Sequence, residues 1–578
     1  MQKTALISVY NKESITDFAK SLVDLGWKII SSGGTAKYLK DAGISVTDVA
    51  EITGMPPILD HRVVTLHPKI HGGLLALDKP EHLAELEKYG IPFIDLVCVD
   101  LYPLEEEIKN KNATRESVIE KTDIGGPTML RSAAKGGRIV VCDPMDREKV
   151  IEWLKNGEPK GKQQEEFLNN LASKVEITIS RYCLLSAKYH SQKGYRGFLG
   201  EKKEECAYGE NAYQKPAFFY KNLNVKEEPL ALHNWKLLAG NSMSYNNFCD
   251  LDRMMQTMTH IGAGFEKNFA KVPDIAIGAK HGNACGVGLC FAEAGFGHAK
   301  AGVDSKIEAV DKMLMGDLRA IFGGSVMLNF KVDEKIAEEL IHKFSPDIKE
   351  GKQRRLLDIV AAPEFTPEAI DILARKKGKC RILVNPAIEK AGMSSLDVTS
   401  RFRYVRGGFL TQPNYTFVPD LTSNPLLKGE EEIRDIVLAW AVGCTSNSNT
   451  ITLVKDGRLV GNGVGQQDRV GAAKLAIFRA DDAAKFSADQ QKNSPASESL
   501  AGTFREENFS ADLSGAVAYS DSFFPFPDAV EVLINRGIKT IFSTSGSVND
   551  EKIIELCKQK SVNLIMLPDT EARGFYQH

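Results

Sequence analysis

The residues with the clearest chemical potential are the adjacent Lys280 and His281, in the segment AIGAKHGNACGVG. A histidine exchanges a proton near neutral pH, and a neighbouring cation stabilises negative charge that develops on a reacting carbonyl oxygen. Neighbouring side chains of an extended strand point to opposite faces, so both groups reach one substrate only where the backbone turns. Gly282, directly after the pair, allows such a turn. For a Lys-His pair taken alone, a loop lysine beside a histidine at the edge of the core is commoner than a catalytic pair. The rest of the sequence therefore has to decide between the two roles.

Three other clusters of polar residues lie near the N-terminus. SSGGT (31–35) follows an apolar run and opens a helical pattern, which suits phosphate binding and equally suits a capped strand-to-helix turn. DHRVVTLHPKIHGG (60–73) gathers basic and polar side chains around a proline, which favours anion recognition over a solvated loop. TDIGGPTMLRSAAK (122–135) places Asp123 before a Gly-Gly turn, where it is either functional or only a helix cap.

The elements that must position these clusters follow from hydrophobic periodicity. Residues 4–143 alternate short apolar runs with amphipathic stretches, which predicts an α/β domain. The apolar runs within 95–103 and 138–144 are typical of buried parallel strands, whose ends are the expected place of a ligand crevice.

The remainder of the chain divides by composition. Residues 146–200 are charged and helical, which predicts a helical linker region after an N-terminal domain over 1–145. Strands and helices alternate again over 201–578, which predicts two more α/β subdomains. Within them, the polar segment 484–512 is expected to be a surface insertion or mobile loop.

Composition excludes several classes of protein. With 43% hydrophobic and 26% charged residues over 578 positions, the chain is typical of a globular protein with several domains. A net charge of −3 without a long Lys/Arg run predicts no nucleic-acid partner. No apolar stretch of 18 residues and no secretory signal pattern are present, so we expect a cytoplasmic protein without a membrane partner. Ten scattered cysteines match no metal motif, which predicts reduced thiols and no bound metal.

A family resemblance emerges from these segments taken together. SVYNK, SSGGTAKYL, RVVTLHPKIHGGLLA, DLYP and DIGGPTMLRSAAK resemble, in order, the IMP cyclohydrolase domain of the bifunctional purine-biosynthesis enzymes. The rest resembles their AICAR transformylase half through YGENAYQKPAFFY, SMSYNNFCDLD, AKHGNACGVG, FGGSVMLN, VAAPEFTPEA, RYVRGGFL, SNSNTITLVKDGRLVGNGVGQQDRV, SDSFFPFPDAV, SGSVNDE and RGFYQH. The resemblance implies an α/β fold: a methylglyoxal-synthase-like parallel-sheet domain, then a transformylase of two cytidine-deaminase-like α/β subdomains.

The same resemblance implies two consecutive reactions. The transformylase passes a formyl group from 10-formyltetrahydrofolate to the 5-amino group of AICAR, and the cyclohydrolase closes formyl-AICAR to IMP with loss of water. Folate is then a co-substrate, with no tightly bound cofactor, and the other partners are small molecules and a second subunit in a homodimer.

For formyl transfer, the resemblance implies roles for particular residues. His281 matches the base or proton shuttle, and Lys280 matches the group that stabilises developing charge or protonates the folate leaving nitrogen. Asn447 matches the family's catalytic asparagine. The positions that match substrate contacts are Tyr208, Phe523, Arg573 and, toward the folate, Asp317.

For ring closure, Tyr102, Asp123 and Lys135 match members of the family's catalytic constellation. The positions that match phosphate and nucleotide contacts are Ser8, Lys12, Ser32, Gly34, Thr35, Arg62 and Thr65.

The chain also departs from the family pattern. Val64 stands where the family has a lysine close to the closing ring, and Lys12 or Lys69 could reach the vacancy. Ala207 stands where an arginine would help to bind phosphate, and Tyr213 replaces a histidine. Losing one charge-assisted hydrogen bond typically costs about 1.5–3 kcal/mol, which would weaken AICAR binding without abolishing it.

Three functional hypotheses follow. The leading one is the bifunctional enzyme, with cyclisation impaired to an unknown degree. Val64 favours the alternative of a monofunctional transformylase whose N-terminal domain only binds nucleotide, as a ligand sensor does. Ala207 and Tyr213 favour a non-catalytic nucleotide-binding paralogue.

Overall fold

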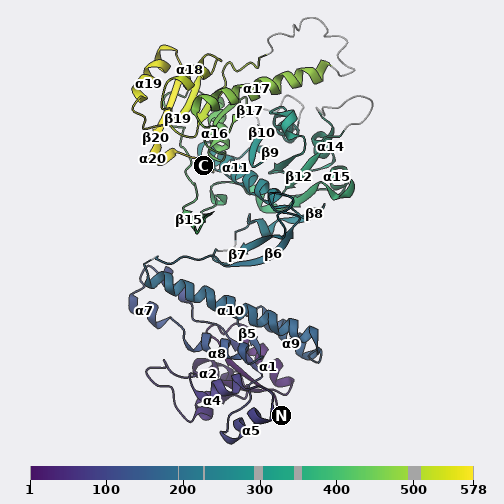
Figure 1. Cartoon of the computed structure of the whole chain (residues 1–578), viewed down its shortest axis with the longest axis vertical. Coiled ribbons are helices and arrows are strands. Elements are labelled where there is room, and N and C mark those ends of the chain that lie inside the picture. Colours follow the sequence, from purple (N-terminus) through teal and green to yellow (C-terminus); the bar gives the residue numbers. More distant parts are fainter. Residues whose placement is uncertain are drawn as a thin grey trace. The chain divides into compact units, whose positions relative to one another are not determined.

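The chain forms two compact units, Met1–Glu201 with Asn222–Asn224 and Lys202–Lys221 with Val225–His578 (Figure 1). The computed structural model describes residues 2–192, 194–225, 228–291, 304–343, 354–427, 429–492 and 510–576.

The first unit is built on a five-stranded sheet in the order β3-β2-β1-β4-β5, and its neighbouring strands pair in parallel. The predicted parallel α/β domain is therefore confirmed. The order of the strands along the chain leads from β1 to one side of the sheet (β2, β3) and then to the other side (β4, β5), so the switch point lies between β1 and β4. Open α/β sheets bind ligands at such a switch point, outside the carboxyl ends of the strands. The strands are β1 (Thr4–Ser8), β2 (Lys28–Ser31), β3 (Thr47–Asp48), β4 (Leu96–Val99) and β5 (Ile139–Val141).

Amphipathic helices bury their apolar faces around this sheet. The expected helical region 146–200 holds α9 and α10, and side chains of both, among them Ile151 and Val175, belong to the same hydrophobic core as the five strands. These helices therefore pack as part of the first unit. The helices are α1 (Ile15–Asp24), α2 (Gly33–Asp41), α3 (Val49–Thr53), α4 (Pro68–Leu75), α5 (Pro80–Lys88), α6 (Leu104–Lys109), α7 (Arg115–Glu120), α8 (Gly125–Lys135), α9 (Asp146–Lys155) and α10 (Lys162–His190).

The second unit contains one continuous sheet of 11 strands, in the order β20-β19-β18-β16-β17-β10-β9-β11-β12-β13-β8. The two α/β subdomains expected here share this sheet, because β10 pairs antiparallel with β17 where Gly288 lies opposite Arg458. The strands are β8 (Lys236–Ala239), β9 (Asp274–Lys280), β10 (Asn283–Cys290), β11 (Gly324–Leu328), β12 (Leu357–Ala362), β13 (Arg381–Val384), β16 (Ile451–Lys455), β17 (Arg458–Gly463), β18 (Val517–Ser520), β19 (Thr540–Ser545) and β20 (Asn563–Pro568).

Two smaller two-stranded sheets accompany it. Their strands are β6 (Gly200–Cys206) with β7 (Ala217–Asn222), and β14 (Arg401–Val405) with β15 (Gly408–Gln412).

Two buried helices, α11 and α16, pack together over the central strands of the second unit. Gly264 of α11 permits their close approach, since a Cβ there would lie 3.0 Å from the ring of the fully buried Trp440. The helices are α11 (Tyr245–Phe269), α12 (Ser305–Leu314), α13 (Leu318–Ile321), α14 (Glu334–His342), α15 (Pro367–Leu373), α16 (Glu430–Cys444), α17 (Arg469–Lys492), α18 (Asp528–Ile534), α19 (Asp550–Gln559) and α20 (Asp569–Ala572), with short 3₁₀ helices at Leu232–Asn234, Lys376–Gly378, Pro386–Lys390 and Met393–Ser395.

The expectation that 484–512 is an insertion or loop is wrong for its first part. Residues 484–492 continue helix α17, and Phe486 packs against the core around β9 to β13 and under the guanidinium of Arg319, 5.0 Å from its ring centroid. This apolar contact anchors a stretch that is otherwise polar. The segment 493–509 lies outside the described residues.

Two sequence expectations concern the whole chain. All ten cysteines are free thiols, as predicted. Within the described ranges, no helix is both long enough and apolar enough to cross a membrane.

Candidate active sites

The first candidate site lies at the carboxyl ends of β1 and β4 in the N-terminal unit. Ser8 ends β1, and the backbone N–H groups of Tyr10 and Asn11 donate to the carboxylate of Asp100, which follows β4. The ammonium group of Lys12 donates to the carbonyls of Val9 and Tyr10. Burial lowers the pKa of Lys12, and Asp100 opposes that shift. Two polar loops are thus cross-linked at the edge where a ligand is expected.

The SSGGT segment forms the turn between β2 and α2 at this edge. Ser32 is the N-terminal cap residue of α2, and within the described part of the chain no side chain lies within 4 Å of the Cβ positions built on Gly33 and Gly34. Gly33 has a positive φ of 52°, which favours glycine. The hydroxyl of Thr35 is occupied, since it accepts from the Val9 N–H at 3.2 Å and donates to the Val9 carbonyl at 3.0 Å. The open glycines, rather than Thr35, are therefore the readier contact for an anion.

Tyr102 and Asp123 lie close enough to influence each other electrostatically. The Asp123 carboxylate accepts from the Gly126 N–H at 2.9 Å, and a Cβ on Gly126 would lie 2.4 Å from the same carboxylate. Burial raises the pKa of Asp123. Burial also raises the pKa of Tyr102, Asp123 raises it further, and Lys121 opposes the rise. The cap and the functional interpretation of Asp123 are therefore compatible, because one carboxylate oxygen anchors α8 beside Tyr102.

Only part of the segment 60–73 lies near Tyr102 and Asp123. Thr65 is buried, and its hydroxyl oxygen lies 3.0 Å from the Cβ position built on Gly125, directly after the Asp123 turn. Arg62 is exposed and pairs with Glu120. Val64 immediately precedes Thr65 in the chain.

Lys135 is the predicted residue that the fold separates from the others. It ends α8, whereas Asp123 precedes the first residue of that helix. Ten residues of α-helix rise about 15 Å, so the two side chains belong to opposite ends of α8. Lys135 instead lines a pocket with Arg131 and Glu176.

The second candidate site contains the Lys-His pair, at the turn between β9 and β10. His281 and Gly282 have φ angles of 51° and 71°, and Lys280 pairs with Asn283 across the two-residue loop. Two successive positive φ angles are the signature of a type I′ hairpin turn, in which glycine is favoured at the second position. The predicted backbone turn is confirmed.

Neighbouring groups fix this turn from two sides. The Lys280 ammonium donates to the Phe322 carbonyl at 2.9 Å, and the Gly282 N–H donates to Asp250 of α11 at 2.8 Å. Burial raises the pKa of Asp250, while the Gly282 N–H and the charge of His281 oppose the shift. The Asn283 amide oxygen accepts from the Asn447 N–H at 3.2 Å. The Lys-His turn and Asn447 therefore meet through Asn283.

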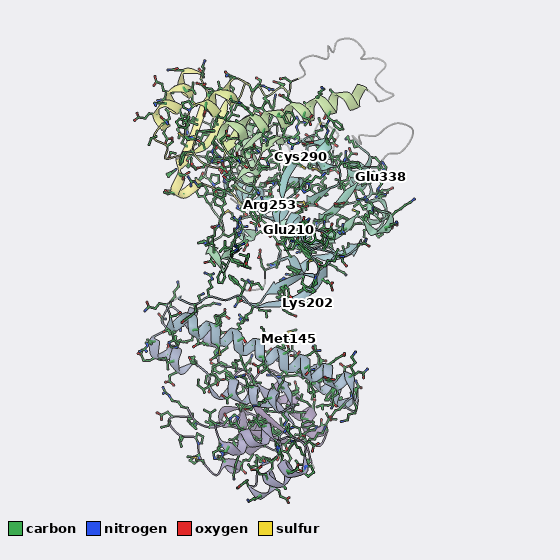
Figure 2. All side chains as sticks on the ribbon, in the orientation of Figure 1. Met145, Lys202, Glu210, Arg253, Cys290 and Glu338 are labelled. Atoms are coloured by element: carbon green, nitrogen blue, oxygen red, sulfur yellow. The ribbon has the colours of Figure 1, made fainter. Side chains whose placement is uncertain are left out.

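Arg253 of α11 holds the side chain of Asn447 (Figure 2 labels Arg253 within the second unit). Both terminal nitrogens of its guanidinium donate to the Asn447 side-chain oxygen at 3.1 Å, and one donates to the Thr445 carbonyl at 2.6 Å. Burial lowers the pKa of Arg253 to about 10. The guanidiniums of Arg253 and Arg401 both stack on the Tyr576 ring, 3.6 Å from its centroid.

Sequence reasoning missed Arg253, Asp250 and Arg401 as site residues. Asp250 lies inside the segment SMSYNNFCDLD, and Arg253 follows it directly. The available signal for Arg253 was a charged residue among the buried methionines Met254 and Met255. A buried arginine needs a hydrogen-bonding partner, but the neighbouring sequence does not show which residue that partner is.

Phe523 and Arg573 form a neighbouring cluster. The Arg573 guanidinium lies 5.5 Å from the Phe523 ring centroid, and its Nε donates to the Ser522 hydroxyl at 3.1 Å. Arg573 also pairs with Asp569 at 2.8 Å. Three residues further on, the Tyr576 N–H donates to the Ser446 carbonyl at 3.0 Å, beside Asn447. The segment 573–576 thus connects the predicted nucleotide contacts to the Asn447 cluster.

The remaining predicted contacts are positioned separately. The Tyr208 carbonyl accepts from the Tyr245 N–H at the start of α11, and Ala207 donates to the Met243 carbonyl. Tyr213 is 83% exposed, so its side chain faces solvent in this chain. Asp317 caps the short helix α13 by accepting from the Ala320 N–H, and burial raises its pKa. The start of α11 therefore holds the backbone of Tyr208, and the cap of α13 holds the side chain of Asp317.

In the part of the chain that the structure describes, no group of three or more His, Cys, Asp or Glu side chains is arranged to hold a metal ion.

Comparison with known proteins supplies the family context for both sites. A family model described as the AICARFT/IMPCHase bienzyme matches residues 133–479, and one described as the MGS-like domain matches residues 14–128. The chain is 36% identical over 583 residues to the bifunctional purine biosynthesis protein PurH of Anoxybacillus flavithermus, and 37% identical over 580 residues to that of Thermoanaerobacter sp. (strain X514). Each alignment covers 98% of both proteins. A crystal structure of ForH is 33% identical over 34% of this chain and 100% of its own, with a TM-score of 0.30 that supports no fold argument.

Proposed function

The chain belongs to the AICARFT/IMPCHase bienzyme family of bifunctional purine biosynthesis proteins, and on that premise we propose that its two units carry the two reactions at separate sites. The second unit transfers the formyl group of 10-formyltetrahydrofolate to AICAR. The first unit closes the formyl-AICAR product to IMP. The observation that carries the proposal is the β9–β10 turn, which presents Lys280 and His281 beside Asn447 through Asn283.

Formyl transfer requires an amine to attack the formyl carbon while a proton leaves the amine nitrogen. His281 sits in the turn with its backbone fixed by the Asp250 bond to Gly282, which suits a group that accepts that proton. Lys280 supplies positive charge for the oxyanion or a proton for the departing folate nitrogen. Asn447 orients the AICAR carboxamide, and Arg253 keeps its side chain in one position.

The substrate contacts of this reaction are assigned by the same premise. Tyr208, Phe523 and Arg573 bind the nucleotide, and Asp317 binds the folate. Arg573 lies over the Phe523 ring and pairs with Asp569, and it is the arginine assigned to the nucleotide in a chain that has alanine at position 207, where the family has an arginine.

Ring closure is intramolecular, so orientation supplies much of its acceleration. The open Gly33-Gly34 turn and Ser32 at the start of α2 suit the phosphate. By the same family premise, the other phosphate and nucleotide contacts are Ser8, Lys12, Thr35, Arg62 and Thr65. Asp123 and Tyr102 exchange protons with the closing ring. Lys135 is assigned to the same reaction, although it lies at the far end of α8. In the proposed homodimer, Lys135 of one subunit takes part in ring closure at the site of the other subunit. We place both activities in the cytoplasm.

The decisive experiment supplies purified protein with AICAR and 10-formyltetrahydrofolate. Formation of IMP supports the bifunctional assignment. Accumulation of formyl-AICAR supports a monofunctional transformylase whose N-terminal unit only binds nucleotide, and absence of formyl transfer supports the non-catalytic paralogue.

A single substitution tests the division of labour between the units. We expect His281→Ala to abolish formyl transfer and to leave the closure of supplied formyl-AICAR unchanged, because the base belongs to the second unit. His342→Ala, which removes an exposed histidine of the same unit, is the matched control and should affect neither reaction. Equal loss of both reactions in His281→Ala would refute separate sites.

A further inference from the structure

The N-terminal candidate site has a cation that sequence reasoning did not identify. Lys121 lies between α7 and α8, and its ammonium nitrogen is 3.4 Å from the Tyr10 hydroxyl and 5.1 Å from the Tyr10 ring centroid. The Tyr10 ring contacts the Tyr102 ring edge to face, with 5.6 Å between centroids. Lys121 is thus held beside the tyrosine that the proposed cyclisation uses.

The backbone that carries Lys121 is fixed by Tyr182, a buried residue of α10. The Tyr182 hydroxyl donates to the Lys121 carbonyl at 2.9 Å and accepts from the Asp123 N–H at 2.6 Å. One hydroxyl therefore sets the spacing between Lys121 and Asp123. The aromatic face of Tyr10 then restricts where the lysine side chain can go, through a cation–π contact.

The position of Lys121 matters because of Val64. A lysine is expected at position 64 from the family resemblance, and the segment that ends in Thr65 packs against Gly125 of the Asp123 turn. Lys121 adjoins the same turn from the chain segment before it. Thr65, the residue after Val64, and Lys121 therefore both lie close to the Asp123 turn.

Lys12 and Lys69 fit the vacancy less well than Lys121. The Lys12 ammonium donates to two backbone carbonyls and is paired electrostatically with Asp100. Lys69 lies in the first turn of α4, and among the described residues no contact of its side chain with Tyr102 or Asp123 is seen. Lys121, by contrast, contacts the Tyr10 ring that packs on Tyr102, and its charge opposes the rise that burial causes in the pKa of Tyr102.

We propose that Lys121 supplies the positive charge for ring closure that Val64 cannot, an inference that rests on the proposed cyclohydrolase function. The carboxamide nitrogen attacks the formyl carbon, and negative charge develops on the formyl oxygen. That oxygen takes one proton from the attacking nitrogen and a second from the formamido nitrogen, and it leaves as water. The Lys121 ammonium stabilises the oxygen while its charge develops.

The test measures cyclisation of supplied formyl-AICAR by the full chain. We expect Lys121→Gln to lower kcat on the order of 10²-fold, the usual effect of removing one electrostatic donor to an oxyanion. Lys121→Arg, which keeps the charge, should lose far less. Lys111→Gln removes an exposed lysine nearby in sequence and should have no effect.

A second variant separates a catalytic from a merely structural role. Adding Val64→Lys to Lys121→Gln should restore most of the lost kcat, because it returns the cation to the position at which the family carries it. Unchanged kcat in Lys121→Gln, or a loss that Val64→Lys does not rescue while formyl transfer stays normal, would overturn the inference. A wild-type chain that binds formyl-AICAR but never closes it would instead refute the proposed cyclohydrolase function.

Discussion

Asp123 shows how one side chain serves both a local and a chemical role. One carboxylate oxygen accepts the Gly126 N–H at the start of α8, which is the ordinary function of an N-terminal acidic residue. Burial nevertheless raises its pKa, so the group is poised to exchange protons closer to neutral pH than an exposed aspartate.

This shift predicts the acidic limb of the cyclisation pH profile. If the ionised Asp123 accepts a proton, kcat/KM falls as pH drops through its raised pKa, so the limb lies above the ordinary value of 3.8. The measurement is kcat/KM for supplied formyl-AICAR across pH, with circular dichroism at each pH to show that the chain is folded. A limb at or below 3.8, or one that persists in Asp123→Asn, would contradict this role.

Arg253 offers a prediction in the other unit. Arg253→Leu removes three hydrogen bonds from a buried charged group to the Asn447 and Thr445 oxygens, so we expect a loss of about 1.5–3 kcal/mol in the free energy of unfolding. Formyl transfer should fall on the order of 10²-fold, because Asn447 loses its fixed position. Lys331→Ala, which breaks an exposed ion pair with Glu364, should cost about 1 kcal/mol or less in chemical denaturation. Equal effects of the two substitutions would show that Arg253 has no special role.

These residues also mark what the sequence could and could not reveal. Lys280 and His281 were singled out by their chemistry and, with Asn447, were given roles through motif resemblance, and the required turn was expected from the glycines that follow the pair. Arg253 was missed because its partner Asn447 is 194 residues away in the chain, a separation that no local pattern reports. Lys121 was missed because Tyr10 and Tyr102 follow β1 and β4, far from Lys121 in the sequence.

Among the elements, the start of α8 depends on a glycine. The Cβ of Gly126→Ala would lie 2.4 Å from the Asp123 carboxylate and 3.0 Å from Leu101, so Asp123 must move. We expect cyclisation to fall at least about 10-fold while formyl transfer is unchanged, since small displacements of a catalytic group are costly.

The control for this substitution is another helical glycine of the same unit. A Cβ on Gly72 of α4 would lie 3.4 Å from the Ile91 side chain, an ordinary contact. Gly72→Ala should therefore leave both activities intact and stabilise α4 by up to about 1 kcal/mol, the difference in helix propensity. A similar loss of cyclisation in both variants would indicate a general effect on the unit.

Elements were more predictable than their association. The apolar runs at 95–103 and 138–144 predicted β4 and β5, since parallel strands are buried on both faces. Periodicity did not predict the joining of two subdomains into one sheet, because the apolar pattern of a strand does not say which other strand pairs with it. The helical residues 484–492 were misjudged because Phe486 is the only large apolar residue among them.

At the scale of the whole molecule, two separate sites predict complementation between inactive variants. A mixture of His281→Ala and Asp123→Asn proteins should convert AICAR to IMP, because formyl-AICAR released by the second variant can be closed by the first. The assay follows IMP from AICAR and 10-formyltetrahydrofolate for each variant alone and for the mixture. Failure of the mixture, with each variant still performing its remaining reaction, would mean that the intermediate is not released into solution.

The long sheet of the second unit also affects how the chain folds. Gly288 of β10 and Arg458 of β17 meet across the middle of the sheet, although β10 and β17 are separated by four other strands of that sheet along the chain. Such distant pairings form slowly, because the entropy of closing a long loop is lost before the contacts form that stabilise the pairing. Until β17 has been synthesised, the outer edge of β10 remains unpaired, and an unpaired strand edge promotes aggregation. While residues 291–463 are being synthesised, this edge of β10 is therefore open to pairing with strands of other chains.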